Sequence, residues 1–76
     1  MGKQLWAVSY INWYDYKLTT VFVRADTWQD ALVQHPECKG YDWDFSSLEA
    51  AKQTAFDCDS MIEVVEVPNE NQVQGS

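Results

Sequence analysis

The chain has 76 residues, enough for one small domain and too few for two. Twelve Asp and Glu residues outweigh five Lys and Arg residues, which gives a net charge of −7. The basic residues stand singly, so the sequence argues against direct binding to nucleic acid or to an anionic membrane, because both require a clustered positive face.

Two strands are predicted near the start of the chain. In residues 3–12, Trp6, Val8 and Tyr10 alternate with Leu, Ala, Ser and Ile, a pattern typical of a strand. Residues 18–25 are rich in Thr, Val and Phe and predict a second strand after a polar, aromatic turn. We expect these two strands to form an antiparallel hairpin.

A first helix of two to three turns is predicted to begin at Asp26-Thr27. This pair supplies an oxygen that can cap free amide groups, and Asp30 places a carboxylate in the first turn. Pro36 disfavours helical geometry in the residue before it, so we expect the helix to end at residue 34 or 35. Its buried side should carry Trp28, Ala31, Leu32 and His35.

A second helix and a last strand follow. Ser46 and Glu49 form a capping signature, with Ser46 as the expected cap of a helix that extends to residue 57. Residues 61–67 predict a strand, in which the adjacent Val64 and Val65 interrupt the alternation and predict a bulge or burial on both faces. The order strand, strand, helix, helix, strand predicts an α+β fold.

The expected architecture is a three-stranded antiparallel sheet with two helices packed on one face and with the first strand in the centre. Residues 1–68 should form this single domain, and residues 69–76 a disordered polar tail. The other face of the sheet would stay open and carry apolar residues, which favours a homodimer or a partner there. These residues are Leu5, Ala7, Ser9 and Ile11.

Two segments interleave aromatic rings with carboxylates, residues 13–16 and residues 41–45, and both fall where loops are expected. Exposed rings flanked by carboxylates suit Lys and Arg side chains through cation–π contacts and charge pairing. We therefore predict a non-enzymatic binding module that contacts a basic protein surface. The candidate contacts are Trp13, Asp15, Tyr41, Asp42, Trp43 and Asp44.

Several alternatives are open from the sequence. The rings of both segments can instead cap the ends of the core, or stack on a small molecule or carbohydrate, and the chain can be a structural or dimerisation domain. His35, Cys38 and Cys58 with a neighbouring Asp offer a zinc set, but the pattern lacks two close ligand pairs, so no metal or cofactor is predicted. Without a membrane-spanning run or signal peptide, we expect a cytoplasmic protein with reduced thiols.

The layout from Trp6 to Val67 resembles the small acidic accessory proteins of bacteriophages, including anti-CRISPR-type inhibitors. The similarity includes residues 47–52 of the second helix and residues 61–65 of the last strand. The resemblance implies a non-catalytic protein that blocks a host protein, sometimes by imitating the charge of nucleic acid. It carries over no functional residue.

Overall fold

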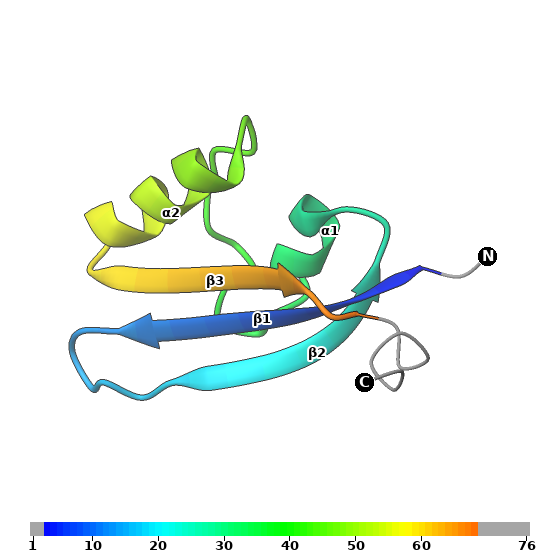
Figure 1. Ribbon diagram of the computed structural model, residues 1–76. Coiled ribbons are helices and arrows are strands. Elements are labelled where there is room, and N and C mark those ends of the chain that lie inside the picture. The colour runs from blue at the N-terminus through cyan, green and yellow to red at the C-terminus, as the bar shows by residue number, and fades with distance from the viewer. Residues whose placement is uncertain (1–2, 69–76) are drawn as a thin grey trace.

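The computed structural model describes residues 3–68 and shows a three-stranded antiparallel sheet with two helices above one of its faces (Figure 1). The predicted α+β class and antiparallel sheet are confirmed, and the predicted tail at residues 69–76 lies outside the described residues. No helix among residues 3–68 is long and apolar enough to cross a membrane. The elements in chain order are β1 (Gln4–Asn12), β2 (Thr19–Ala25), α1 (Trp28–Leu32), α2 (Leu48–Asp57) and β3 (Ser60–Glu66).

The strand order is β2-β1-β3, with β1 in the centre as predicted. Val8 lies opposite Val21 on β2 and opposite Val64 on β3, and both pairings are antiparallel. Alternate residues of each strand point to opposite faces, so this register sends Val8 and Val64 toward the helices, where both are buried.

The core lies between the helices and the sheet. Ala51 and Ala55 of α2 are fully buried, and their small side chains let the helix lie close to β3. Ala31 and Leu32 of α1 are also fully buried. The face predicted for the first helix is confirmed, since His35 is buried beside these residues and Trp28 packs against the core.

Helix α1 is shorter than predicted, because it ends at Leu32 and not at residue 34 or 35. Its start is confirmed, since the Thr27 side chain accepts a hydrogen bond from the Asp30 N–H. Beyond Leu32, the N–H of Gln34 and of His35 each bond to a carbonyl three residues back, so the helix tightens into turns before Pro36.

The cap of α2 is Ser47 and not Ser46, a correction of one residue. The Ser47 side chain accepts a hydrogen bond from the Ala50 N–H. Ser46 is used differently, because its N–H and its hydroxyl both donate to Oδ1 of Asp44. Helix α2 ends at Asp57, as predicted.

Strand β3 has no bulge. It begins at Ser60 and pairs with β1 in one continuous register to Glu66. The adjacent valines are therefore divided between the two faces, with Val64 buried and Val65 50% exposed. The double valine thus adds an apolar side chain to the open face and is not buried on both sides.

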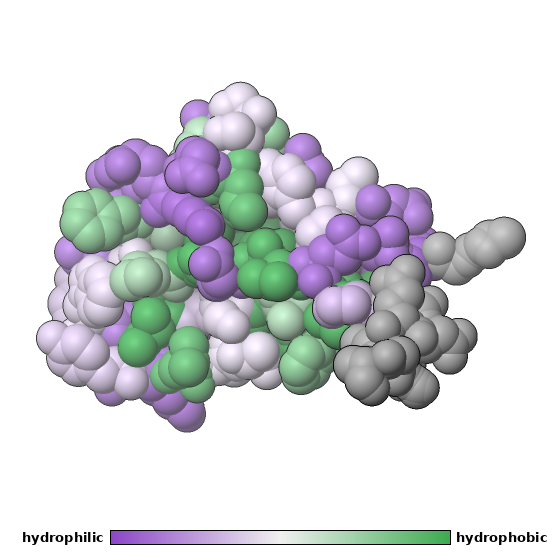
Figure 2. Space-filling view, in the orientation of Figure 1, coloured by the Kyte–Doolittle hydropathy of each residue, from purple (hydrophilic) through white to green (hydrophobic). Residues whose placement is uncertain are grey.

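The open face of the sheet is the face away from the helices, and it carries the outward side chains of the three strands. The register places Phe22, Ala7 and Val65 side by side across it. Figure 2 shows hydrophobic residues gathered mainly over the strands and hydrophilic residues mainly over the helices. The prediction that Leu5, Ala7, Ser9 and Ile11 face this side is confirmed, and self-association through it stays a prediction. Its most exposed apolar residues are Phe22, Val65 and Met61.

Candidate functional site

The second aromatic and acidic segment, residues 41–45, lies in the connection between the two helices, and its first four side chains alternate between inward and exposed positions. Trp43 is only 6% exposed, and Tyr41 is half-buried. Asp42 and Asp44 lie between and after these rings and are exposed. Gly40 precedes the segment with a φ of 88°, a conformation that glycine adopts without strain. The segment therefore holds Tyr41 and Trp43 inward and displays its carboxylates, whereas Phe45 is 41% exposed.

Two hydrogen bonds fix the inward rings of this segment. Nε1–H of Trp43 donates to the Cys38 carbonyl over 2.9 Å, and the two rings Tyr41 and Trp43 pack with centroids 4.9 Å apart. The Tyr41 hydroxyl lies 3.0 Å from the Tyr10 hydroxyl, which in turn lies 3.1 Å from Oγ of Ser60. The connection is thus tied to β1 and β3 through side chains, and the carboxylates rest on a fixed backbone.

Asp44 is held ionised by its own loop. The Ser46 hydroxyl donates to Oδ1 of Asp44 over 2.6 Å, and the Ser46 N–H donates to the same atom over 3.0 Å. These bonds favour the charged form and lower the pKa of Asp44 below its ordinary value. The carboxylate therefore offers a lasting negative charge at the surface.

The first aromatic and acidic segment, residues 13–16, forms the turn between β1 and β2. Oδ1 of Asn12 accepts from the N–H of Tyr14 and of Asp15, a local bond that shapes the turn. The Trp13 N–H donates to the Asp59 carbonyl, so the turn is fastened to the residue before β3. Asp15 is exposed, Trp13 is half-buried, and Tyr14 is 81% exposed.

The Tyr14 hydroxyl reaches Oδ2 of Asp59 over 3.0 Å. Ionisation of the phenol would place two negative oxygens together, so this hydrogen bond raises the pKa of Tyr14. Tyr16 lies beside Trp13, with ring centroids 6.2 Å apart, and has a positive φ of 53°. The exposed aromatic surface of this turn thus comes from Tyr14 and Tyr16 more than from Trp13.

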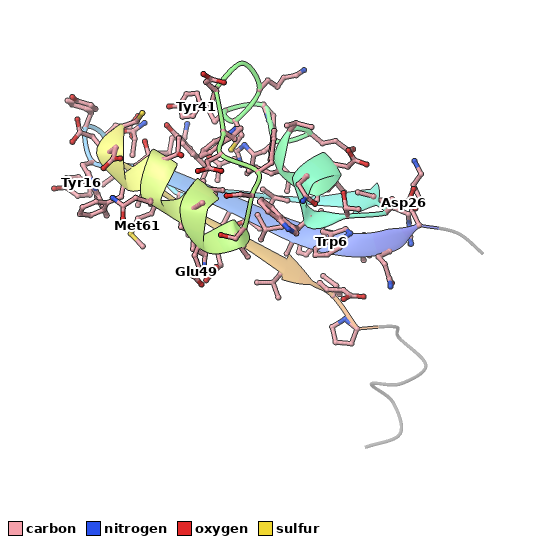
Figure 3. The ribbon with its side chains drawn as sticks, turned by 90° about the horizontal axis from the view of Figure 1, so that it is seen from above. Trp6, Tyr16, Asp26, Tyr41, Glu49 and Met61 are labelled. Atoms are coloured by element: carbon pink, nitrogen blue, oxygen red, sulfur yellow. The ribbon has the colours of Figure 1, made fainter. Side chains whose placement is uncertain are left out.

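The two segments do not form one continuous site by hydrogen bonding. Within residues 3–68, no hydrogen bond joins residues 13–16 to residues 41–45. Figure 3 shows Tyr16 at one end of the molecule and Tyr41 along a different side. The six candidate contacts therefore divide into a hairpin pair, Trp13 and Asp15, and a connection set of Tyr41, Asp42, Trp43 and Asp44.

The zinc alternative finds no support in the positions of its residues. Nδ1 of His35 accepts from the Glu37 N–H over 3.0 Å, and Nε2 lies 3.1 Å from the Thr19 carbonyl, to which it must donate. Both ring nitrogens of this fully buried histidine are therefore occupied by the backbone. In the part of the chain that the structure describes, no three His, Cys, Asp or Glu side chains cluster as metal ligands.

The two cysteines differ in environment, as Cys38 is buried and Cys58 is exposed at the end of α2. Both are free thiols in the structure. Burial, followed by the nearby Glu37 charge, raises the pKa of Cys38 to about 12. The hydrogen bond with Tyr10, followed by burial, raises the pKa of Tyr41 to about 12.

These shifts predict that the fold is lost more easily at alkaline pH. Since the pKa of each group is higher in the folded than in the unfolded chain, its contribution is complete below the unfolded pKa and declines as pH rises toward about 12. We expect the urea midpoint to be lower at about pH 11 than at about pH 8, and Cys38→Ala to show a smaller decline. Equal declines in the parent and this variant would contradict the role of Cys38.

Sequence reasoning offered core capping by the rings as an alternative to surface contact, and the burial of Trp43 and Tyr41 supports that alternative for these two rings. The alternation of rings and carboxylates in residues 41–44 is itself a period of two, which could have indicated inward rings and outward carboxylates. The long-range bond between Tyr41 and Tyr10 carries no local signal. Comparison of the chain with protein-family models, curated proteins and solved structures finds no significant match.

Proposed function

We propose that this chain is a small acidic binding module that occupies a basic surface of another protein. The observation that supports it most is the display of Asp42 and Asp44 on a connection whose intervening ring, Trp43, is anchored in the core. A contact surface that is rigid before binding loses less conformational entropy when a partner orders it. In this proposal Trp43 and Tyr41 hold the backbone, and the two carboxylates meet Lys or Arg.

The charge balance of the surface supports a basic partner. All eleven carboxylate side chains of residues 3–68 are exposed. Within the same residues, one ion pair is present, between Lys52 and Glu63. Most of the negative charge is therefore not neutralised within the chain and can steer a positively charged partner toward it.

The hairpin supplies a second acidic and aromatic surface in this proposal. Asp15 is exposed beside Tyr14 and Tyr16, whose rings are 81% and 69% exposed. Exposed Tyr rings can stack on guanidinium groups, and the adjacent carboxylate can pair with them. The same rings would also suit a neutral sugar or small molecule, which is the alternative function. Inhibition of a host protein, the class implied by the resemblance to phage proteins, belongs to the proposal as its biological consequence.

The proposal predicts that neutralising two carboxylates weakens binding without unfolding the chain. Asp42→Asn/Asp44→Asn keeps side-chain size, and Asn can still accept from Ser46. We expect basic proteins from a bacterial lysate to bind the immobilised parent at low salt, to elute as salt rises, and to bind the variant at least tenfold less. Quantitative mass spectrometry of the eluates measures this difference.

Asp26→Asn/Asp30→Asn is the matched control, because it changes the net charge by the same amount on exposed residues. Figure 3 shows Asp26 at the end of the molecule away from Tyr41. Equal loss of binding in the control would show that only overall charge matters. Binding that persists at high salt and in both variants would favour a stacked neutral ligand instead.

A further inference from the structure

The outer edge of β3 carries unpaired backbone groups. The Val67 N–H donates to the Leu5 carbonyl, and the Trp13 N–H donates to the Asp59 carbonyl. The backbone N–H and C=O groups of the odd-numbered residues of β3 therefore point toward β1. Backbone groups alternate in direction along a strand, and those of Ile62, Val64 and Glu66 therefore point away from the sheet. No residue among 3–68 forms a hydrogen bond with them.

A groove runs beside this edge. It has a volume of about 360 Å³ and lies between α2 and β3, which run alongside each other in Figure 1. Its helical wall is one stripe of α2, with residues three or four positions apart, and its apolar end holds Phe56 and Met61, which are 60% and 49% exposed. The lining residues are Glu49, Lys52, Gln53, Phe56, Met61, Ile62 and Glu63.

The opposite edge of the sheet, along β2, is occupied in part. Nε2 of Gln34 donates to the Arg24 carbonyl over 3.0 Å, so one carbonyl that an added strand would need as an acceptor is already hydrogen-bonded. Strand β3 thus combines a free hydrogen-bonding edge with a groove for side chains, and β2 does not. Extended peptides that add to a sheet require both features, the edge for affinity and the groove for specificity.

We propose that β3 accepts an extended basic segment of a partner protein as a fourth strand, with alternate side chains in the groove beneath α2. Glu49 and Glu63 line the groove, and Glu66 ends the strand. The basic residue in the groove lining is Lys52, which already pairs with Glu63 over 2.7 Å. Basic side chains of the added strand meet these carboxylates, and an apolar side chain meets Phe56.

A second copy of this chain suits the edge less well than a basic segment. Two β3 strands paired with each other would bring Glu63 and Glu66 of both copies to one new sheet, within a complex of two chains that each carry −7. This strand-binding site and the function proposed above have only a basic partner in common. None of the six candidate loop contacts takes part in it, so either proposal can fail without the other.

The test uses a capped eight-residue peptide in which Lys or Arg alternates with Val or Phe, and a control peptide with Glu at the basic positions. NMR of the labelled full chain follows its amide groups during titration. We expect the basic peptide to slow amide exchange of Ile62 and Val64 by roughly tenfold or more, because their N–H groups gain hydrogen bonds. The acidic peptide should leave both amides unchanged.

Two variants of one residue separate the edge from its charge. Glu66→Pro removes an outward N–H and leaves the bonds to β1, whereas Glu66→Gln keeps the N–H and removes the charge. We expect affinity for the basic peptide to fall at least tenfold in the proline variant and only a few-fold in the glutamine variant. Unchanged amide shifts of residues 61 and 63 in the absence of peptide confirm that the sheet is intact.

Asp42→Asn/Asp44→Asn should bind the basic peptide as the parent does, which keeps the two proposals distinct. The inference is overturned if the basic peptide does not bind or if both peptides protect Ile62 and Val64 equally. It is also overturned if the largest shifts fall on Ala7 and Phe22 of the open face, or if the free chain protects this edge by associating with itself.

Discussion

Replacement of Trp43 by alanine is expected to destabilise the fold by about 3–5 kcal/mol, the usual cost of deleting a large buried aromatic side chain. Trp43 is 6% exposed, packs on Tyr41 and donates to the Cys38 carbonyl. Its loss would leave a cavity and remove the shorter of two hydrogen bonds to the Cys38 carbonyl, which also accepts from the Tyr41 N–H. Native domains have free energies of unfolding of about 5–15 kcal/mol, and small domains lie near the lower end of this range. The variant should therefore be only marginally folded.

Trp43→Phe separates the two contributions. Phenylalanine fills most of the space but cannot donate to Cys38, so we expect a loss of roughly 1–3 kcal/mol. Urea titration followed by far-ultraviolet circular dichroism measures both variants, and Asp42→Ala is the control on the neighbouring exposed residue, with an expected change within about 0.5 kcal/mol. A Trp43→Ala variant as stable as the control would contradict the anchoring role and return Trp43 to the surface contacts.

The contrast between Trp43 and Asp42 explains how far the sequence could predict the candidate site. The local pattern correctly places residues 41–45 in a connection and marks them as aromatic and acidic. It does not tell whether a ring points to solvent or to the core, because that depends on the fold of the loop around the Cys38 carbonyl and on the Tyr10 hydroxyl, which is distant in the chain. The sequence thus identifies the segment, and the packing assigns the role of each residue.

The fold was more predictable than the site because its signals are local. Alternation in residues 3–12, the Thr27 cap and the register imposed by one buried face determine the elements and the central position of β1. The position of the second helix cap was predicted wrongly because two neighbouring residues offer the same local signal. Ser46 and Ser47 can both cap a helix, and the choice follows from Asp44, which binds Ser46.

The double valine of β3 shows a second limit of the sequence. Val64 and Val65 interrupt the alternation, and a bulge would have restored it. The structure keeps the register and exposes Val65 on the open face. Whether a sheet accepts an exposed apolar residue depends on what covers that face, and this information is not present in the strand itself.

The buried histidine gives the second large effect. His35 is fully buried, accepts from the Glu37 N–H and donates to the Thr19 carbonyl, and so links the turn after α1 to the start of β2. His35→Phe keeps an aromatic ring beside Tyr10 and removes both of these hydrogen bonds. We expect a loss of about 1–3 kcal/mol, because each of the two hydrogen bonds contributes about 0.5–1.5 kcal/mol.

Urea titration measures this loss, with Gln34→Ala as the control. The Gln34 side chain also bonds to backbone carbonyls, those of Arg24 and Asp30, but it is exposed, so its removal should cost less than about 1 kcal/mol. The 15N shifts of the imidazole provide an independent check. They should show a protonated Nε2 and an unprotonated Nδ1, since the two backbone partners require this tautomer. The opposite tautomer, or a His35→Phe variant as stable as the parent, would mean that His35 contributes through its volume alone. The polar link between α1 and β2 would then have no role in the stability of the sheet edge.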